Sequence, residues 1–228
     1  MSQSYNPEYA KYMDHTVLKP ETTRETVKRF CDEAKQYHFA SVCINPCHVA
    51  YVHEQLKDSG VKTCCVIGFP LGANTTHIKA EEAKEAVANG ADEVDMVINI
   101  GALKDKNYDY VYEDILAVVN AAHPKAGVKV IIETSALTDE EKIKACELAL
   151  KANADFVKTS TGFAASGASE EAVTTMLDEA KGRIKVKPSG GIRNYETAKK
   201  YVDMGASRLG IGFGTALKIC EGEKEAEK

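Results

Sequence analysis

Short apolar runs recur along the chain and alternate with longer charged segments that are rich in alanine. Most of the runs are nearly continuous stretches of β-branched and other apolar residues, which is typical of parallel strands covered on both faces. They span residues 41–45, 62–69, 93–99, 129–134, 156–161, 184–189 and 208–213, with a shorter eighth run at 13–18. The alternation predicts a chain built from βα units.

The segments between the runs carry helix start signals. Thr138 with Glu141 is typical of a capping box, and Thr22 with Glu25 predicts another. The repeat of about 27 residues matches one βα unit, and eight such units predict a closed (β/α)8 TIM barrel. An open doubly wound sheet is the alternative, but no GxGxxG motif follows the first run. We expect one catalytic domain over residues 1–220 and a charged, disordered tail at 221–228.

Composition narrows the classes of function. The 228 residues carry a formal charge of −5, and no basic stripe of the kind that nucleic-acid binders use is present in the sequence. No apolar run is long enough to span a membrane, and the first residues lack the features of a signal peptide. The odd number of cysteines, seven, favours a reducing, cytoplasmic location. Neither nucleic acid nor a membrane is therefore an expected partner.

The cysteines do not predict a metal site. Cys43, Cys47 and His48 lie close together and Cys64 adjoins Cys65, but neither group has paired zinc-ligand spacing. Neighbouring residues on a strand also point to opposite faces, so Cys64 and Cys65 do not easily share one site. We expect buried small hydrophobes here, and no metal or cofactor.

Three charged residues stand inside apolar runs. Lys158 and Lys187 lie on neighbouring predicted strands, and Asp95 lies in the run at 93–99. A buried structural ion pair is the simplest explanation for any one of them. Two lysines at an assumed separation of about 6 Å repel by about 2.8 kcal/mol at an effective dielectric of 20, which lowers one amine pKa by about two units. A lysine activated in this way, with desolvation adding to the effect, is a good amine nucleophile for carbonyl carbons.

Glycines cluster after the last strands of the predicted barrel. Residues 189–193 read SGGIR, residues 210–214 read GIGFG, and Thr161-Gly162 closes the sixth run. In this fold the loops after strands seven and eight often hold a phosphate with backbone N–H groups, and Arg193 adds a cation. Tight turns in a crowded barrel also need glycine. The clustering at both loops favours phosphate binding.

Six blocks of the chain together resemble the signature of the deoxyribose-phosphate aldolase family. They are DHTVLKP (14–20), VIGFP (66–70), GADEVDMVINIGALK (90–104), KVIIET (129–134), ADFVKTSTGF (154–163) and SGGIR (189–193). The blocks occur in the order of the family and cover the chain from about residue 14 to about residue 216.

The resemblance implies reversible cleavage of 2-deoxy-D-ribose 5-phosphate to acetaldehyde and D-glyceraldehyde 3-phosphate without a metal. The family commonly forms dimers or tetramers, and we expect a homodimer here. It implies that Lys158 forms a Schiff base, that Lys187 lowers its pKa and that Asp95 is the general acid and base, partly through a water molecule. It places Asp14, Thr16 and Cys43 near the substrate and Lys129 beside Asp95. Around the substrate phosphate it places Gly162, Gly190, Gly191, Arg193, Gly210 and Gly212. We also expect Thr161, which precedes Gly162, to bind the substrate.

The chain departs from the family pattern at three places. Gly212 and Phe213 stand where the family often has two serines, Pro188 replaces a usual alanine, and the tail lacks a tyrosine found in some members. These changes keep open a related Schiff-base aldolase with another or an unphosphorylated aldehyde acceptor. A barrel that binds a phosphorylated ligand without catalysis is a second rival hypothesis, and a metal or redox protein that uses the cysteines is a third.

Overall fold

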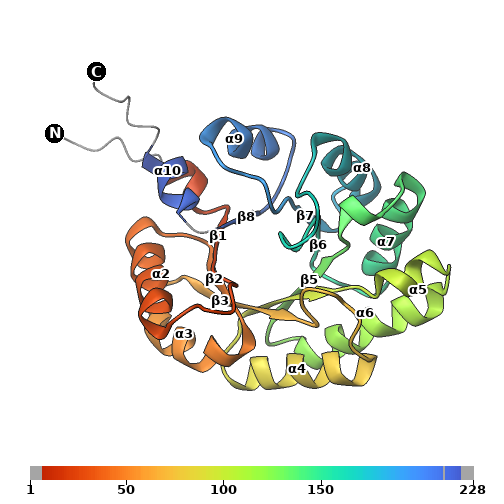
Figure 1. The fold of residues 1–228 in the computed structure, drawn as a ribbon, viewed down its shortest axis with the longest axis horizontal. Helices are drawn as coiled ribbons and strands as arrows, with labels where there is room; N and C mark the ends of the chain where they lie inside the picture. The colour runs from red at the N-terminus through yellow and green to blue at the C-terminus, as the bar shows by residue number, and fades with distance from the viewer. Residues whose placement is uncertain (1–6, 213, 222–228) are drawn as a thin grey trace.

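Eight parallel strands form the centre of the computed structural model, which describes residues 7–212 and 214–221 (Figure 1). The strands are β1 (Met13–Thr16), β2 (Ser41–Ile44), β3 (Lys62–Ile67), β4 (Glu93–Val97), β5 (Gly127–Ile131), β6 (Phe156–Lys158), β7 (Lys185–Lys187) and β8 (Leu209–Ile211). Their order, β7-β6-β5-β4-β3-β2-β1-β8, follows the sequence around the ring. Between β7 and β8 a bridge joins Ser189 to Gly210, and the Gly210 N–H donates to the Pro188 carbonyl at 2.9 Å. The predicted (β/α)8 barrel is confirmed.

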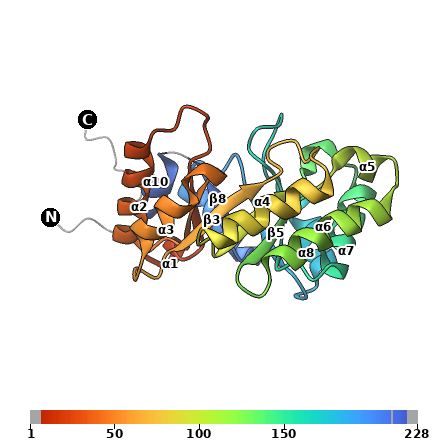
Figure 2. The same ribbon diagram turned by 90° about the horizontal axis from the view of Figure 1, so that it is seen from below.

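Helices surround the strands on the outside, as the two ribbon views show (Figures 1 and 2). They are α1 (Pro7–Ala10), α2 (Arg24–Tyr37), α3 (Val49–Leu56), α4 (Thr76–Ala88), α5 (Ile100–Lys104), α6 (Tyr108–Ala122), α7 (Asp139–Lys151), α8 (Glu170–Ala180), α9 (Tyr195–Asp203) and α10 (Thr215–Glu221). Short 3-10 turns cover Pro46–His48 and Thr134–Ala136. Most of the predicted tail, residues 222–228, lies outside the described residues, as does Phe213.

One of the two predicted capping boxes is confirmed. At the start of α7 the Thr138 hydroxyl accepts from the Glu141 N–H, and the Glu141 carboxylate accepts from the Thr138 N–H. The other prediction is wrong by one residue. Thr23, not Thr22, caps α2, because its backbone is extended (φ −85°, ψ 160°) and its hydroxyl accepts from the Thr26 N–H.

The barrel wall separates an apolar layer from a polar interior. Side chains alternate along each strand, so Val94 and Met96 of β4 join the apolar core between strands and helices while Glu93 and Asp95 point inward. Register then brings charged residues together, since Asp95 lies opposite Lys129 on β5. The parallel pairing thus gathers buried charges inside the barrel, where most barrels of this fold place apolar side chains.

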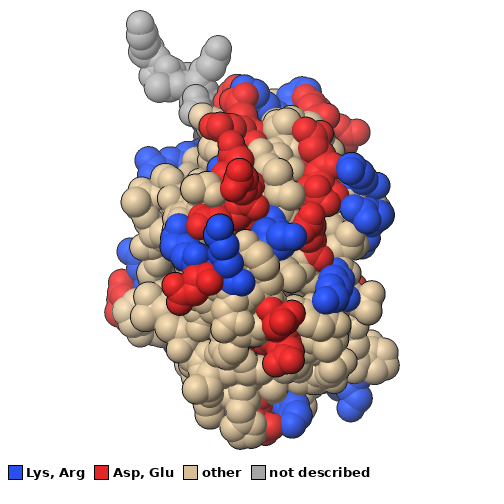
Figure 3. Space-filling model, turned by 90° about the vertical axis from the view of Figure 1, so that its right-hand side faces the viewer, with Lys and Arg blue, Asp and Glu red and all other residues tan. Residues whose placement is uncertain are grey.

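The outer surface carries both signs of charge. On the face at the right-hand side of Figure 1, basic and acidic side chains are interspersed (Figure 3). None of the helices in the described part of the chain has the length and apolar character that crossing a bilayer requires.

The loop after β3 packs directly onto the end of β4, and Gly72 makes this possible. A Cβ atom at Gly72 would lie 1.9 Å from the Ile98 carbonyl oxygen, and the Gly72 φ angle is +68°.

Gly182 provides a matched control, because it has the same backbone conformation (φ +72°) and no atom lies near the Cβ that alanine would add. Both alanine variants carry the left-handed penalty of about 1 kcal/mol. We expect Gly72→Ala to lose about 2 kcal/mol more than Gly182→Ala in urea unfolding. Equal losses would contradict the close approach.

Candidate active site

A pocket of about 390 Å³ opens at the C-terminal ends of β1, β6, β7 and β8. Lys158, the last residue of β6, lines it. The other predicted site residues in its wall are Thr16, Thr161, Gly162, Gly190, Gly191, Arg193, Gly210 and Gly212. The remaining predicted residues lie away from this wall and are fully buried: Asp14, Cys43, Asp95, Lys129 and Lys187. The predicted residues therefore form two groups, one lining the pocket and one buried within the barrel, and Lys158 connects them.

Asp95 is the centre of the buried group. Its Oδ1 lies 2.8 Å from the Lys129 Nζ, and its Oδ2 lies 2.9 Å from the Lys158 Nζ and 2.7 Å from the Lys187 Nζ. The last two distances share one oxygen, so the Lys158 and Lys187 nitrogens lie less than about 6 Å apart. Lys129, expected beside Asp95, is in direct contact with it.

Asp14 forms a second buried node. It pairs with Lys187, and its Oδ1 accepts from Arg208 Nη1 and from the Ser41 hydroxyl, each at 2.6 Å. Asp14 was predicted to lie near the substrate. Among its contacts is Lys187, which is also fully buried.

Glu93 is a third buried carboxylate, which the sequence analysis did not single out. Its Oε2 lies 2.6 Å from the Lys129 Nζ and 2.9 Å from Arg208 Nη1. Two sequence signals point to this pair. Glu93 is two residues before Asp95 and so shares its face of β4, and Arg208 directly precedes the apolar strand β8.

The buried network holds one more cation than anions. Its carboxylates are Asp14, Glu93 and Asp95, and its cations are Lys129, Lys158, Lys187 and Arg208. Lys62 adds a further positive charge at the rim, where its half-exposed side chain reaches Glu93 at 2.8 Å. The described residues of the site therefore carry more positive than negative charge.

The pKa shifts show which members keep their charge. Burial favours the neutral form of Asp95, but Lys129, Lys158 and Lys187 outweigh it and lower the pKa of Asp95 well below its usual range. Burial also opposes the charge on Lys187, yet Asp14 and Asp95 raise its pKa above the usual lysine value. Among the described residues Lys158 forms an ion pair with Asp95 alone, and it is the lysine of this network that lines the pocket.

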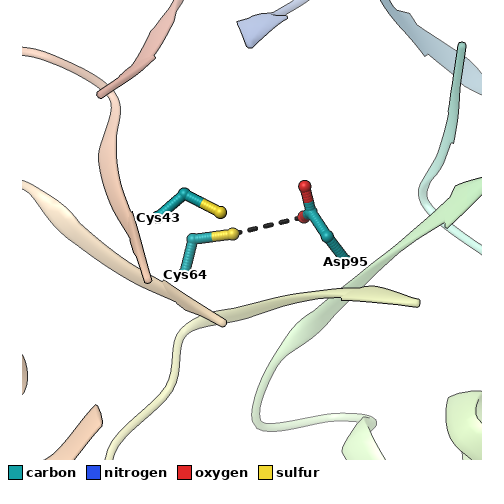
Figure 4. Close-up of side chains that lie close together, drawn as sticks. All are labelled: Cys43, Cys64 and Asp95. Atoms are coloured by element: carbon teal, nitrogen blue, oxygen red, sulfur yellow. Dashed lines mark hydrogen bonds between the residues drawn. The ribbon is translucent and has the colours of Figure 1, made fainter. Parts of the chain in front are cut away.

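The side chains of Cys43, Cys64 and Asp95, from the neighbouring strands β2, β3 and β4, point toward one another (Figure 4). Their sulfur and oxygen atoms lie within 4.8 Å of one another, close enough to suggest a metal site. Lys129 already binds two of the three groups, with its Nζ 3.3 Å from the Cys64 sulfur and 2.8 Å from Asp95 Oδ1. A divalent ion here would have to compete with an ammonium group that is held by three carboxylates.

The loops after β6 and β7 approach each other through their backbones. Gly162, Gly190 and Gly191 have φ values of +85°, +78° and +77°. A Cβ at Gly167 would lie 2.3 Å from the Gly190 carbonyl carbon and oxygen, so this glycine is required by the close approach. Gly167 was not singled out from the sequence, because only the folded loops show what it faces.

Other residues of the predicted phosphate end have different surroundings. A Cβ at Gly210 would lie 2.3 Å from the Ser189 hydroxyl, whereas nothing lies near one at Gly212. The buried Pro188 uses its carbonyl to accept the Gly210 N–H, which ties β7 to β8. Arg193 is exposed at the pocket, and no carboxylate within the described residues pairs with it.

Comparison with known proteins assigns the chain to a family. Residues 9–222 match the DeoC/LacD family of aldolases. The chain belongs to this family. The resemblance inferred from the six blocks is thereby confirmed, and the chain is an aldolase. The deoxyribose-phosphate aldolase of Clostridium tetani is 58% identical over 217 residues, which cover 95% of this chain and 100% of that protein. The deoxyribose-phosphate aldolase of Enterococcus faecalis is 57% identical over 210 residues, or 92% and 96% of the two chains.

Solved structures agree. A tetrameric deoxyribose phosphate aldolase from Aeropyrum pernix is 33% identical with a TM-score of 0.88, covering 96% of this chain and 93% of that one. The aldolase QR15 is 43% identical with a TM-score of 0.88, covering 94% and 95%. The similarity extends over the whole barrel of this family member.

The carboxylates of the network make the fold sensitive to acid. Burial disfavours the Glu93 carboxylate, but Lys129 and Arg208 lower the pKa of Glu93 to about 2. The folded pKa lies below the unfolded value near 4.3, so this stabilisation is complete above that value and is lost as the pH falls towards 2. Glu93→Gln should cost about 3 kcal/mol of unfolding free energy at pH 7. The deficit should shrink between pH 4.5 and 2.

Chemical denaturation at a series of pH values measures this deficit. Glu140→Gln, at an exposed position in the first turn of α7, is the control and should follow the wild type throughout. A deficit for Glu93→Gln that stays constant down to pH 2 would show that the Glu93 pKa is not lowered.

Proposed function

We propose that this aldolase cleaves 2-deoxy-D-ribose 5-phosphate reversibly to acetaldehyde and D-glyceraldehyde 3-phosphate, through a Schiff base on Lys158. The observation that carries the proposal is the place of Lys158, whose side chain lines the pocket while its Nζ contacts the Asp95 carboxylate. The names of the relatives from Clostridium tetani and Enterococcus faecalis support the choice of substrate.

The charge balance explains how Lys158 becomes a nucleophile. When it loses its proton, three buried carboxylates face three buried cations, Lys129, Lys187 and Arg208. The neutral amine then attacks the C1 aldehyde of the open-chain sugar and water leaves, which forms an iminium. The iminium restores a positive charge beside Asp95, so the carboxylate that held the ammonium also stabilises the intermediate.

Bond cleavage uses the iminium as an electron sink. The C2–C3 bond breaks, its electron pair forms an enamine, and the C3 hydroxyl loses its proton as the C3 carbonyl forms. The enamine carbon then takes up a proton, and hydrolysis frees acetaldehyde and Lys158. We assign these proton transfers to Asp95, because its Oδ2 touches the nitrogen atoms of both Lys158 and Lys187. The lowered pKa of Asp95 keeps its carboxylate ionised at neutral pH, so that it is free to accept a proton.

The other end of the pocket suits a phosphate. Arg193 and the glycines at 162, 190 and 191 line the same pocket as Lys158. Backbone N–H groups and a guanidinium are the usual ligands of a phosphate. An unphosphorylated acceptor would leave Arg193 without a partner in this wall, which favours the phosphorylated sugar.

We also propose that residues 1–220 act as one catalytic domain in a cytoplasmic homodimer. The tetramer described for the Aeropyrum pernix protein supports self-association in the family. The odd number of cysteines is typical of a reducing compartment. Sedimentation velocity on the purified protein distinguishes a dimer, at twice 24.8 kDa, from a monomer or a tetramer.

Trapping the imine tests the nucleophile. After incubation with acetaldehyde and borohydride, peptide mass spectrometry should locate a reduced ethyl group on Lys158. The adduct should be absent in Lys158→Ala and unchanged in Lys185→Ala, a control on the neighbouring strand whose side chain is exposed. A folded wild type that acquires no adduct at Lys158 would refute the mechanism.

Arg193 provides a test of the phosphate end. We expect Arg193→Ala to raise KM for 2-deoxy-D-ribose 5-phosphate by about tenfold to a hundredfold, since a charge-assisted hydrogen bond contributes about 1.5–3 kcal/mol. The value of kcat/KM for unphosphorylated 2-deoxy-D-ribose should stay the same. Steady-state kinetics with both sugars measure the difference, and an equal loss for both would argue against a phosphate contact.

A further inference from the structure

The C-terminal end of β5 leads into a buried carboxylate that the proposed mechanism does not use. Glu133 is 4% exposed and follows the strand by two residues. Its backbone is left-handed, with φ 59° and ψ 65°, a conformation that glycine adopts readily and glutamate rarely. A side chain kept at such a position is a candidate for a specific role.

The Glu133 side chain fastens the loop that follows β6. Its Oε2 accepts from the Thr161 N–H at 3.2 Å and from the Thr161 hydroxyl at 2.5 Å. The same hydroxyl accepts from the Phe163 N–H at 3.1 Å. Thr161, Gly162 and Phe163 all line the pocket, whereas Glu133 is not part of its wall.

A carboxylate suits this task because it only accepts hydrogen bonds. By taking the hydroxyl hydrogen of Thr161, it leaves the lone pairs of that oxygen for the Phe163 N–H. The loop needs such a restraint, since Gly162 is exposed and its φ of +85° is not fixed by a side chain.

Further hydrogen bonds link the ends of the neighbouring strands β5, β6 and β7. The Thr134 N–H donates to the Thr159 carbonyl at 2.8 Å, and the Ser189 N–H donates to the Thr159 hydroxyl at 3.0 Å. Glu133 therefore joins the end of β5 to the glycine loop after β6, and Thr159 joins the same region to Ser189, which begins the glycine loop after β7.

We propose that Glu133 is a positioning residue for the substrate phosphate, holding the 161–163 loop in the shape that binds it without touching the ligand. This inference rests on the proposed function for the identity of the phosphorylated ligand. It predicts a defect confined to phosphorylated ligands, because Lys158 and its partner Asp95 have no contact with Glu133 among the described residues.

Kinetics with two sugars test the proposal. Glu133→Ala should raise KM for 2-deoxy-D-ribose 5-phosphate by about tenfold, while kcat/KM for unphosphorylated 2-deoxy-D-ribose stays within about threefold. Glu133→Gln keeps an acceptor oxygen and should restore most of the affinity. Thr161→Val should reproduce the defect, and the double variant should be no worse, because both changes break the same fastening. Glu140→Ala, at an exposed position, is the control.

Two further measurements separate a failure of the Glu133 proposal from a failure of the proposed aldolase mechanism. Calorimetric titration with inorganic phosphate should show binding weakened about tenfold in Glu133→Ala, whether or not the protein cleaves the sugar. Should Glu133→Ala fail to fold, Glu133→Gly removes the carboxylate and relaxes the backbone, and should show the same selective defect.

Equal losses of activity for both sugars, or unchanged binding of inorganic phosphate, would overturn the proposal. A wild type that binds phosphate but forms no Lys158 adduct would instead refute the aldolase mechanism.

Discussion

The sharing of the Asp95 carboxylate among three buried ammonium groups is the interaction on which the site depends. Burying a lysine without a partner costs several kcal/mol, so each of the three requires a carboxylate in contact. Asp95 supplies only one negative charge to the three ammonium groups of Lys129, Lys158 and Lys187. Asp14 and Glu93 supply the others, together with a further cation in Arg208. The barrel interior is therefore a network in which removal of a carboxylate leaves buried cations without a counter-charge.

The network and the fold constrain each other. Parallel pairing places Asp95 opposite Lys129 and Lys158 opposite Lys187, so the charges meet only when the strands have the correct register. A slip of one residue would turn these side chains into the apolar layer outside the barrel. The gathered charge serves the proposed chemistry, in which an iminium on Lys158 takes the place of its ammonium group beside Asp95.

The site residues that could be predicted from the sequence are those whose residue type is unusual for the strand in which they lie. Lys158 and Asp95 could be predicted because charges are rare within continuous apolar strands. Arg208 directly precedes a strand, where charges are common, so its signal was weaker than that of a charge inside a strand. The depth of Asp14 below the pocket depends on how the strands are staggered in the closed barrel, which single-strand patterns do not contain.

The central role of the shared carboxylate is tested most directly by a crystal structure of the protein after acetaldehyde and borohydride treatment. We expect an ethyl group on the Lys158 Nζ that extends into the pocket, with the Asp95 carboxylate still in contact with both Lys158 and Lys187. An ethyl group on a different lysine, or an Asp95 side chain turned away from Lys187, would contradict the claim that this shared carboxylate organises the chemistry.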